Sequence, residues 1–370
     1  MQLSEKIKGS FDIFSCYRCS GKLVHNSGEN LRCSECNSIF EVRQGIPVLT
    51  DEENYWCNFP KEKMHELIRV SENEDHRKAL EKVISDKEIR DYIVQETRVD
   101  PLFFLPFNKE SVVLDVGCKW GGLTIPFSDY CKTIVGVDTT FETVKFLDIR
   151  RNQLNKDNIQ LAVASALNLP FSDNIFDIVI LNGVLEWLGY STGFDATKDY
   201  GLKTDKFLRS KDDPQKMQEN GIRNIFRVLK PGGKLMIGIE NRYGLDYFFG
   251  APEDHANLKF VSLIPRKMAN WYMKKKLNRE FRTYTHSMGA LRKMLNKTGF
   301  EKTEFFGAFP TYRDPDFIVS LEKKNILDYF LKRFIGNTSK NPVYRSIKSI
   351  LFKTGFYKYL VHSFIVIAQK

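Results

Sequence analysis

The chain has 370 residues, 42% of them hydrophobic, and a formal net charge of +10 at neutral pH. This length favours one large domain with an accessory module, and the apolar content is enough for a real core. No apolar run is long enough to span a membrane, and the first residues lack the core of a signal peptide, so we expect a cytoplasmic protein. The charge favours acidic partners: nucleic acid, phosphate-bearing substrates or an anionic membrane.

Four of the seven cysteines form two Cys-x-x-Cys pairs near the start of the chain. Four thiolates suit tetrahedral Zn²⁺ in a closed structural site, and the segment between the pairs is typical of a hairpin. The sequence therefore predicts a zinc ribbon in residues 1–50, with the ligands Cys16, Cys19, Cys33 and Cys36. The alternative is four unrelated thiols. A module this small is expected to serve folding, docking or substrate grip.

Residues 51–110 are charged, with apolar residues at helical spacing, as at Leu80, Val83 and Ile84. This pattern predicts a connector of two or three helices that covers the start of the following sheet.

The most informative stretch follows at 112–124. The apolar run 112–114 leads into Asp115 and a glycine-rich turn at 117–122, which predicts a buried parallel strand and a turn that a ligand can approach closely. A second apolar strand, 133–137, ends at Asp138. An acid about 20 residues beyond such a turn is positioned to bond ribose hydroxyls.

Strands and helices then alternate along the chain. Apolar runs predict strands at 159–163, 235–239, 301–309 and 364–368 and one that begins at 176, and helices at 141–155, 222–229 and 288–297. This alternation predicts an α/β domain over 111–370, with insertions near 189–220 and 322–360. The first insertion is a candidate lid.

The pattern of Asp115, Gly117, Lys119 and Gly121, followed by Asp138, resembles the first two motifs of class I S-adenosylmethionine (AdoMet)-dependent methyltransferases. Leu-Pro-Phe at 169–171 and Leu-Lys-Pro-Gly-Gly at 229–233 also resemble turns of this family. The resemblance covers about residues 85–310 and the strand 364–368. It implies a doubly wound, mostly parallel, seven-stranded Rossmann-like sheet in which strands six and seven are antiparallel.

The resemblance also implies which residues bind AdoMet. They are Asp115, Gly117, Cys118, Gly121, Asp138, Thr139, Ser165, Ala166, Asn182 and Gly183. Two positions depart from the family pattern: Lys119 replaces the middle glycine, and Ser165 replaces the acid that contacts the adenine amino group. The alternative is another kind of nucleotide-binding α/β domain.

The string at 239–255 gathers acids, an amide, an arginine and a histidine after the carboxyl end of a strand. Its form resembles methyltransferases associated with surface polysaccharide and glycan synthesis. His255 is the candidate general base, because its ordinary pKa lies near working pH. Glu253 or Asp254 is expected to orient it, and Glu186, after the fourth strand, to lie beside the substrate. The alternative is that 252–255 caps a helix.

Residues 325–360 are basic, with interleaved apolar residues. Such a stretch is typical of contact with an anionic membrane, here the inner face, and it also suits an RNA backbone. The alternative is a solvated helix that packs its apolar side.

Three hypotheses follow. The leading prediction is an AdoMet-dependent methyltransferase that O-methylates a glycan or a related hydroxyl-bearing metabolite. The second is an RNA methyltransferase that grips phosphates with the ribbon and the basic face, although no Asn/Asp-Pro-Pro-Tyr tetrapeptide of amino-group methylases follows the fourth strand. The third is a scaffold that has lost catalysis, which Lys119 and Ser165 motivate.

Overall fold

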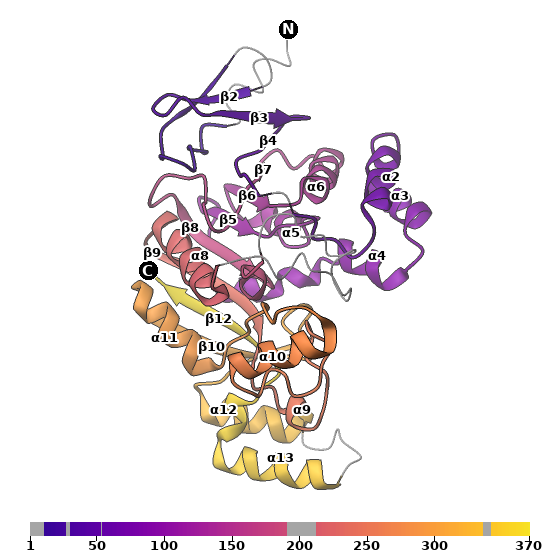
Figure 1. Cartoon of the computed structure of the whole chain (residues 1–370), viewed down its shortest axis with the longest axis vertical. Helices are drawn as coiled ribbons and strands as arrows, with labels where there is room; N and C mark the ends of the chain where they lie inside the picture. The colour runs from indigo at the N-terminus through magenta and orange to yellow at the C-terminus, as the bar shows by residue number, and fades with distance from the viewer. Residues whose placement is uncertain (1–10, 27–29, 53, 191–211, 336–341) are drawn as a thin grey trace.

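The computed structural model describes residues 11–26, 30–52, 54–190, 212–335 and 342–370 (Figure 1). Within these residues the main sheet has eight strands in the order β11-β10-β12-β9-β8-β5-β6-β7. Their bounds are β5 (Val112–Val116), β6 (Thr133–Asp138), β7 (Ile159–Val163), β8 (Phe176–Asn182), β9 (Leu229–Glu240), β10 (Lys302–Phe309), β11 (Phe317–Ser320) and β12 (Ser363–Gln369).

The centre of the sheet is parallel. β5 pairs with β6 on one side and β8 on the other, and β7 and β9 extend the parallel set outward. Parallel strands are covered on both faces, which explains why these segments are nearly continuous apolar runs. Their carboxyl ends share one edge, and Asp138 and Asn182 are the last residues of β6 and β8.

The predicted antiparallel ending is confirmed, but the predicted count of seven strands is wrong. β12 is antiparallel to both β9 and β10, as expected for the last two strands of the family. The additional strand is β11, which pairs with residues 306–309 of β10. It has four residues and begins with the exposed Phe317, so it lacks the buried apolar run that identified the other strands.

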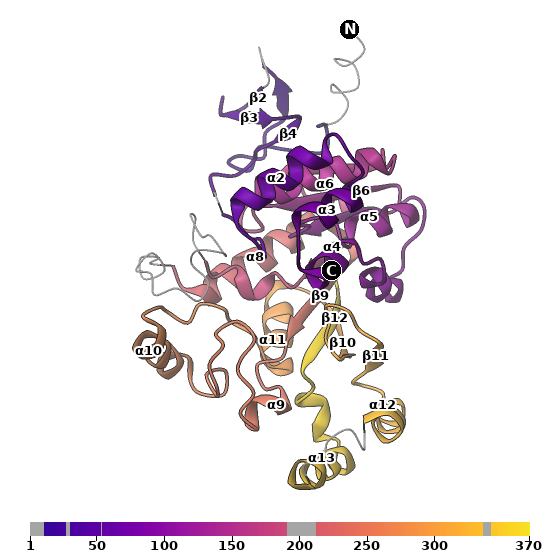
Figure 2. The ribbon, with the colours of Figure 1, turned by 90° about the vertical axis from the view of Figure 1, so that its right-hand side faces the viewer.

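Helices cover both faces of the sheet (Figure 2). Alternate residues of β5 enter different cores: Leu114 packs with α8 and α11, and Val113 packs with α5 and α6. The bounds are α5 (Thr124–Phe127), α6 (Phe141–Gln153), α8 (Pro214–Val228) and α11 (Met288–Thr298). The doubly wound α/β prediction is therefore confirmed.

Helix α8 begins eight residues before the predicted start at 222. The prediction missed its first half because that half is polar and lacks an apolar periodic pattern. Asp213 caps it through the N–H of Gln215, and Pro214 occupies its first turn. Gln218 is buried in this half and donates to the Leu185 and Tyr284 carbonyls. Such partners lie far away in sequence, so periodicity did not reveal them.

The connector contains the predicted helices. They are α2 (Lys61–Ser71), α3 (His76–Val83), α4 (Lys87–Val94) and the 3-10 helix η1 (Thr97–Phe104). Asp75 and Asp86 cap α3 and α4 with their side chains. Their apolar faces pack around Trp120 and Phe146, so the connector covers the glycine-rich turn and α6.

The N-terminal module is a small antiparallel sheet of β1 (Leu23–His25), β2 (Asn30–Cys33), β3 (Ile39–Arg43) and β4 (Ile46–Pro47). It docks at the β7 edge of the main sheet, at the top of Figure 1. The Leu49 N–H donates to the Val163 carbonyl at 2.8 Å, and the Ser15 N–H donates to the Pro170 carbonyl at 2.8 Å. The module is thus joined to the domain through backbone bonds.

The opposite end of the molecule carries the C-terminal helices (Figures 1 and 2). They are α9 (Leu245–Phe248), α10 (Arg266–Leu277), α12 (Lys324–Phe330), the π-helical turn Leu331–Ile335, α13 (Pro342–Thr354) and the 3-10 helix η6 (Phe356–Tyr359). None of the helices in the described part of the chain is long and apolar enough to cross a membrane. Residues 191–211, the core of the predicted lid, lie outside the described residues.

Candidate active site

The glycine-rich turn folds onto Asp138. Gly117 and Gly121 have φ values of 79° and 81°, which glycine adopts without steric cost. The N–H of Lys119 donates to Asp138 Oδ2 at 3.1 Å, and the N–H of Thr140 donates to Oδ1 at 2.9 Å. A carboxylate has about four acceptor positions, so Asp138 retains capacity for a ligand hydroxyl. Burial raises its pKa, while the backbone bonds oppose this.

Lys119 occupies the middle position of the turn with φ of 45°. Its side chain is directed toward the connector, where Nζ lies 3.4 Å from Asn58 Oδ1 and 4.9 Å from the centre of the Trp120 ring. The departure from the glycine pattern is thus accommodated by an outward side chain.

Asp115 supports the turn from below. It is 2% exposed and accepts a bond from Thr124 Oγ1 at 2.6 Å. Burial raises its pKa to about 6, although the Thr124 bond acts in the opposite direction. Cys118, within the turn, is also buried.

Ser165 lies after β7 and has an acidic partner. Its Oγ donates to Glu52 Oε1 at 2.8 Å and accepts from the Leu167 N–H at 3.2 Å. Burial raises the pKa of Glu52, and the bond from Ser165 lowers it. Glu52 comes from the connector, so a carboxylate is present beside the position where the family has an acid. No sequence pattern identified Glu52, because its partner is 113 residues away.

Asn182 and Gly183 continue the same edge of the sheet. Gly183 has φ of 70° and donates its N–H to the Gly238 carbonyl at 2.8 Å. Asn182 lies against Gly238, where a side chain would overlap its amide oxygen. Among the described residues that oxygen is buried without a hydrogen-bond partner. Thr139 is half-buried and Ala166 is buried.

The three predicted catalytic residues come together beside this edge, and a further acid, Glu240, lies with them. Glu186 lies in η3 (Leu185–Trp187), Glu240 ends β9, and Glu253 and His255 follow α9. His255 Nε2 lies 3.9 Å from Glu186 Oε1 and 3.6 Å from Glu240 Oε2. We call Glu186, Glu240, Glu253 and His255 the acid–histidine cluster; each is at most 2% exposed.

Hydrogen bonds orient the cluster. His255 Nδ1 lies 2.8 Å from Glu253 Oε1, as expected for an orienting acid. Arg313 Nη2 donates to Glu240 Oε1 at 2.9 Å. Glu240 belongs to the polar string predicted at 239–255, although it was not named as catalytic. Arg313 was not predicted as a site residue, because it meets Glu240 only when β9 lies near the segment after β10.

The charged groups of the cluster shift one another's pKa values. Burial raises the pKa of Glu186 to about 8, with a further contribution from the Glu240 carboxylate. Burial would lower the pKa of His255, but Glu240, Glu253 and Glu186 together raise it to about 10. A general base needs the neutral ring, so the base role of His255 stays a prediction.

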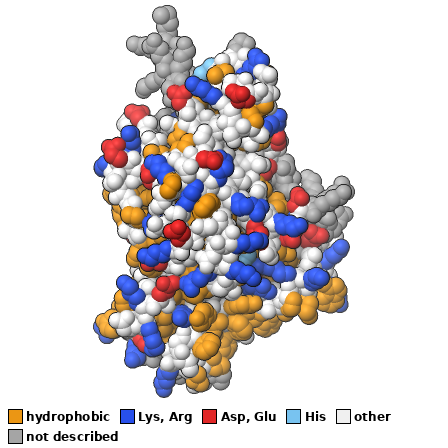
Figure 3. All heavy atoms as spheres, turned by 90° about the vertical axis from the view of Figure 1, so that its left-hand side faces the viewer, with side chains coloured by type: hydrophobic (Ala, Val, Ile, Leu, Met, Phe, Trp, Pro, Cys, Tyr) orange, Lys and Arg blue, Asp and Glu red, His pale blue; other side chains and the backbone are white. Residues whose placement is uncertain are grey.

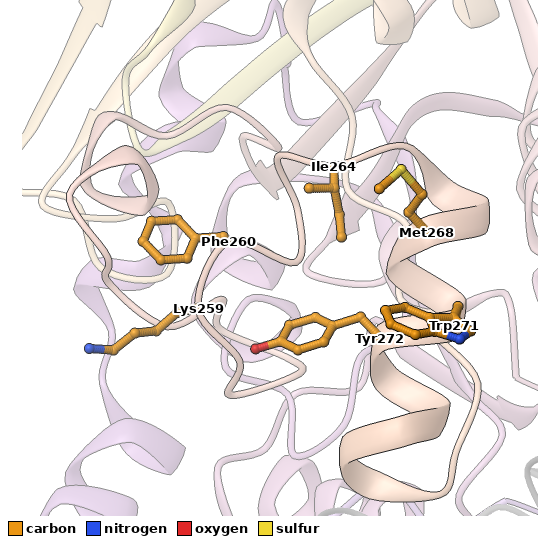
Figure 4. A pocket seen from close by; sticks show the side chains of 6 residues that line it. All are labelled: Lys259, Phe260, Ile264, Met268, Trp271 and Tyr272. Atoms are coloured by element: carbon orange, nitrogen blue, oxygen red, sulfur yellow. The ribbon is translucent and has the colours of Figure 1, made fainter.

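Two hollows in the described surface lie away from these residues. One of about 230 Å³ is lined by Lys259, Phe260, Ile264, Met268, Trp271 and Tyr272 beside α10 (Figure 4). Another of about 380 Å³ is lined by Tyr243, Phe248, Ser287, Met288, Gly289, Tyr359 and Leu360. Neither includes a predicted cofactor or catalytic residue, so they add nothing to the site at the sheet edge.

The two cysteine pairs converge as predicted. Cys16 Sγ lies 3.7 Å from Cys36 Sγ, and Cys19 Sγ lies 3.4 Å from Cys33 Sγ. All four sulfurs are within 4.8 Å of one another.

The sheet order, the glycine-rich turn and the acid that ends β6 define a Rossmann-like methyltransferase fold. Residues 107–297 match the family described as methyltransferase domain, and the chain belongs to this family. The chain is 34% identical over 157 residues to the uncharacterized methyltransferase YcgJ of Bacillus subtilis. The aligned region covers 42% of this chain and 48% of that protein. The chain thus spans about half the length of this relative.

Other relatives are more distant. Demethylmenaquinone methyltransferase of Lactiplantibacillus plantarum is 26% identical over 204 residues, covering 53% of this chain and 74% of that protein. Among solved structures, phosphoethanolamine N-methyltransferase 2 of Haemonchus contortus, in complex with phosphomonomethylethanolamine and S-adenosylhomocysteine, is 17% identical. That match has a TM-score of 0.41 and covers 74% of this chain and 52% of that chain.

Proposed function

We propose that this protein is an AdoMet-dependent methyltransferase. The observation that carries the proposal is Asp138, a carboxylate held by two backbone N–H groups at the carboxyl end of β6 and facing the glycine-rich turn. Ligands of open α/β sheets bind outside this edge, and an acid in this position suits ribose hydroxyls. AdoMet would supply an activated methyl group; the chain supplies its binding and the environment of the acceptor.

Glu52 and Ser165 are proposed to recognise the adenine end. The Glu52 carboxylate replaces the missing family acid, with Ser165 holding it in place at 2.8 Å. A carboxylate accepts a hydrogen bond from an amino group more strongly than a hydroxyl does. This pairing, together with the outward Lys119, argues against the scaffold hypothesis.

We propose a polar, hydroxyl-bearing acceptor, with a glycan as the leading candidate. The acid–histidine cluster lies at the carboxyl ends of β8 and β9, next to Asn182. Carboxylates and an imidazole bond sugar hydroxyls through directed hydrogen bonds. His255, Glu253 and Glu186 are proposed to face the acceptor. An RNA acceptor is the alternative, and salt-dependent RNA binding would favour it.

The cysteine cluster is proposed to hold structural Zn²⁺. At a Zn–S distance of about 2.3 Å, tetrahedral sulfurs lie roughly 3.8 Å apart, close to the 3.7 Å between Cys16 and Cys36. Cys33 and Cys16 are buried and Cys19 and Cys36 are exposed, as in a site at the margin of a small sheet.

Binding of AdoMet by calorimetry tests the proposal. We expect Asp138→Asn to weaken AdoMet binding about 10-fold or more, because a hydrogen bond to a charged group contributes roughly 1.5–3 kcal/mol. The matched control is Asp157→Asn, which changes an exposed acid. No AdoMet binding by the wild-type protein would contradict the proposal and favour the scaffold.

A further inference from the structure

The acid–histidine cluster contains buried polar atoms without hydrogen-bond partners among the described residues. They are both carboxylate oxygens of Glu186, Oε2 of Glu240 and Nε2 of His255. Buried charges ordinarily form pairs or coordinate metals, because leaving them unsatisfied is costly. These atoms belong to three chain segments, and one ligand atom of each residue lies within 4.8 Å of the others, which indicates a missing partner common to the three side chains.

Hydrogen bonding within the cluster does not supply this partner. The distances from His255 Nε2 to Glu186 and Glu240, 3.9 and 3.6 Å, exceed those of ordinary hydrogen bonds. Ligand atoms around a cation with bonds of about 2.0–2.2 Å lie roughly 3.0–3.6 Å apart. The observed separations are therefore close to those of a metal site, and all three ligand atoms lie within 4.8 Å of one another.

Further hydrogen bonds orient the His255 ring and the Glu240 carboxylate. Glu253 accepts from His255 Nδ1 and from the backbone N–H groups of His255 and Ala256, which directs Nε2 toward Glu186 and Glu240. A carboxylate bonded to the far nitrogen of a histidine is the usual second layer of a metal site. Arg313 holds Glu240 Oε1 at 2.9 Å and leaves Oε2 toward the centre. The Trp187 ring packs edge-on against His255, with centres 4.9 Å apart, and shields it.

We propose that Glu186, Glu240 and His255 bind a first-row divalent metal cation. Two carboxylates balance its charge. The mixture of oxygen and nitrogen ligands suits Mn²⁺ or Fe²⁺ better than it suits Ca²⁺, which takes oxygen ligands only. Three protein ligands leave positions open for an exchangeable group. Because the cluster lies at the sheet edge where ligands bind, a hydroxyl oxygen of the acceptor fits such a position; this last role rests on the proposed function.

The test uses the full-length protein, stripped with EDTA and then reloaded with one Zn²⁺ per chain to restore the proposed cysteine site. This protein is titrated with Mn²⁺. Mn²⁺ is chosen because the cysteine cluster, with its soft thiolates, disfavours it. Loss of the free-ion signal in electron paramagnetic resonance reports binding. We expect one Mn²⁺ per chain in the wild type, and at least 10-fold weaker binding in Glu186→Gln and His255→Gln.

The control is Glu142→Gln, another buried acid, which pairs with Lys61 outside the cluster; its Mn²⁺ affinity should equal the wild type. Circular dichroism checks that each variant is folded. Wild-type crystals grown with Mn²⁺ should show an anomalous peak at the cluster, which tests the site even if a variant fails to fold. No Mn²⁺ bound by the wild type, or equal affinity in folded Glu186→Gln and His255→Gln, would overturn the proposal. AdoMet calorimetry is a separate measurement, so failure of the metal site leaves the methyltransferase assignment to its own test.

Discussion

Glu52 and Ser165 form the contact that most changes the interpretation of the site. Ser165 is a departure from the family pattern, yet its hydroxyl holds a carboxylate at 2.8 Å. That carboxylate comes from the start of the connector. We therefore propose that two residues distant in sequence together take the place of the single acid of the family pattern.

Replacing Glu52 with Gln should weaken AdoMet binding by roughly 5–20-fold, because a neutral amide oxygen is a weaker acceptor than a carboxylate. Calorimetry measures the change. The matched control is Asp51→Asn, the preceding acid, which is exposed and pairs with Arg18. Equal affinities for Glu52→Gln and the wild type would remove Glu52 from the cofactor site.

Replacing Lys119 with Gly tests whether the lysine obstructs the turn. A left-handed conformation costs an ordinary residue about 1–2 kcal/mol, but glycine loses roughly 1 kcal/mol of backbone freedom on folding. We therefore expect the free energy of unfolding to change by less than about 1 kcal/mol and AdoMet affinity to stay within about 3-fold. A much tighter complex in Lys119→Gly would instead support the scaffold hypothesis.

At the scale of elements, the N-terminal module and the segment before α11 each contribute a testable property. We expect the stability of the module to depend on its four cysteines, because a structural metal contributes folding free energy in a small domain. The segment before α11 places His286 in a buried position beside Gln218 of α8, with His286 Nε2 2.8 Å from the amide oxygen.

Replacing Cys33 with Ser should abolish zinc binding and unfold the module, since metal binding in such small sheets supplies folding free energy. The wild type should contain one Zn²⁺ per chain by elemental analysis. Cys131→Ala, which changes a buried cysteine outside the cluster, should retain that zinc. Zinc retained in Cys33→Ser would show that the cysteines are not its ligands.

His286 should make stability depend on pH. Burial, with Arg266 and Arg242 nearby, lowers its pKa to about 3. The unfolded chain binds the proton near pH 6.5, so this contribution is fully present above that pH and falls by up to about 1.4 kcal/mol per unit as pH decreases toward 3. Urea unfolding between pH 5 and 8 should show a smaller decrease for His286→Gln. Parallel curves for the two proteins would contradict this assignment.

At the scale of the whole molecule, one end combines basic and apolar side chains. Exposed aromatic and aliphatic residues gather on the C-terminal helices with lysines and arginines, in the lower part of Figure 3. Examples are Ile350, 61% exposed, and Phe356, 60% exposed. Lys348, in contrast, is buried rather than part of this face. We propose that this surface contacts an anionic membrane, which suits a lipid-linked glycan acceptor.

Co-sedimentation with vesicles tests this surface. The wild type should bind vesicles containing phosphatidylserine, and Ile350→Ser with Phe356→Ser should reduce binding several-fold because apolar insertion is lost. Val24→Ser, which changes an exposed aliphatic residue of the distant ribbon, is the control. Equal binding of all three proteins would exclude this face.

The features that could be predicted from the sequence are those that a short, continuous segment of the chain encodes. The strand that ends at Asp138, the two cysteine pairs and the group around His255 each lie within a short segment. Glu52 and Arg313 escaped prediction, because their roles arise from contacts between distant segments. Glu240 belongs to the predicted polar string at 239–255, but it was not named as a catalytic residue. β11 escaped for a different reason, since its four residues carry no buried apolar run.

The most direct measurement is a crystal structure with S-adenosylhomocysteine, the product form of the cofactor. We predict ribose hydroxyls within hydrogen-bond distance of Asp138 and the adenine amino group beside Glu52 and Ser165. A structure in which the ligand fails to bind at the β5–β6–β7 edge, or in which Asp138 contacts no ribose, would contradict this prediction.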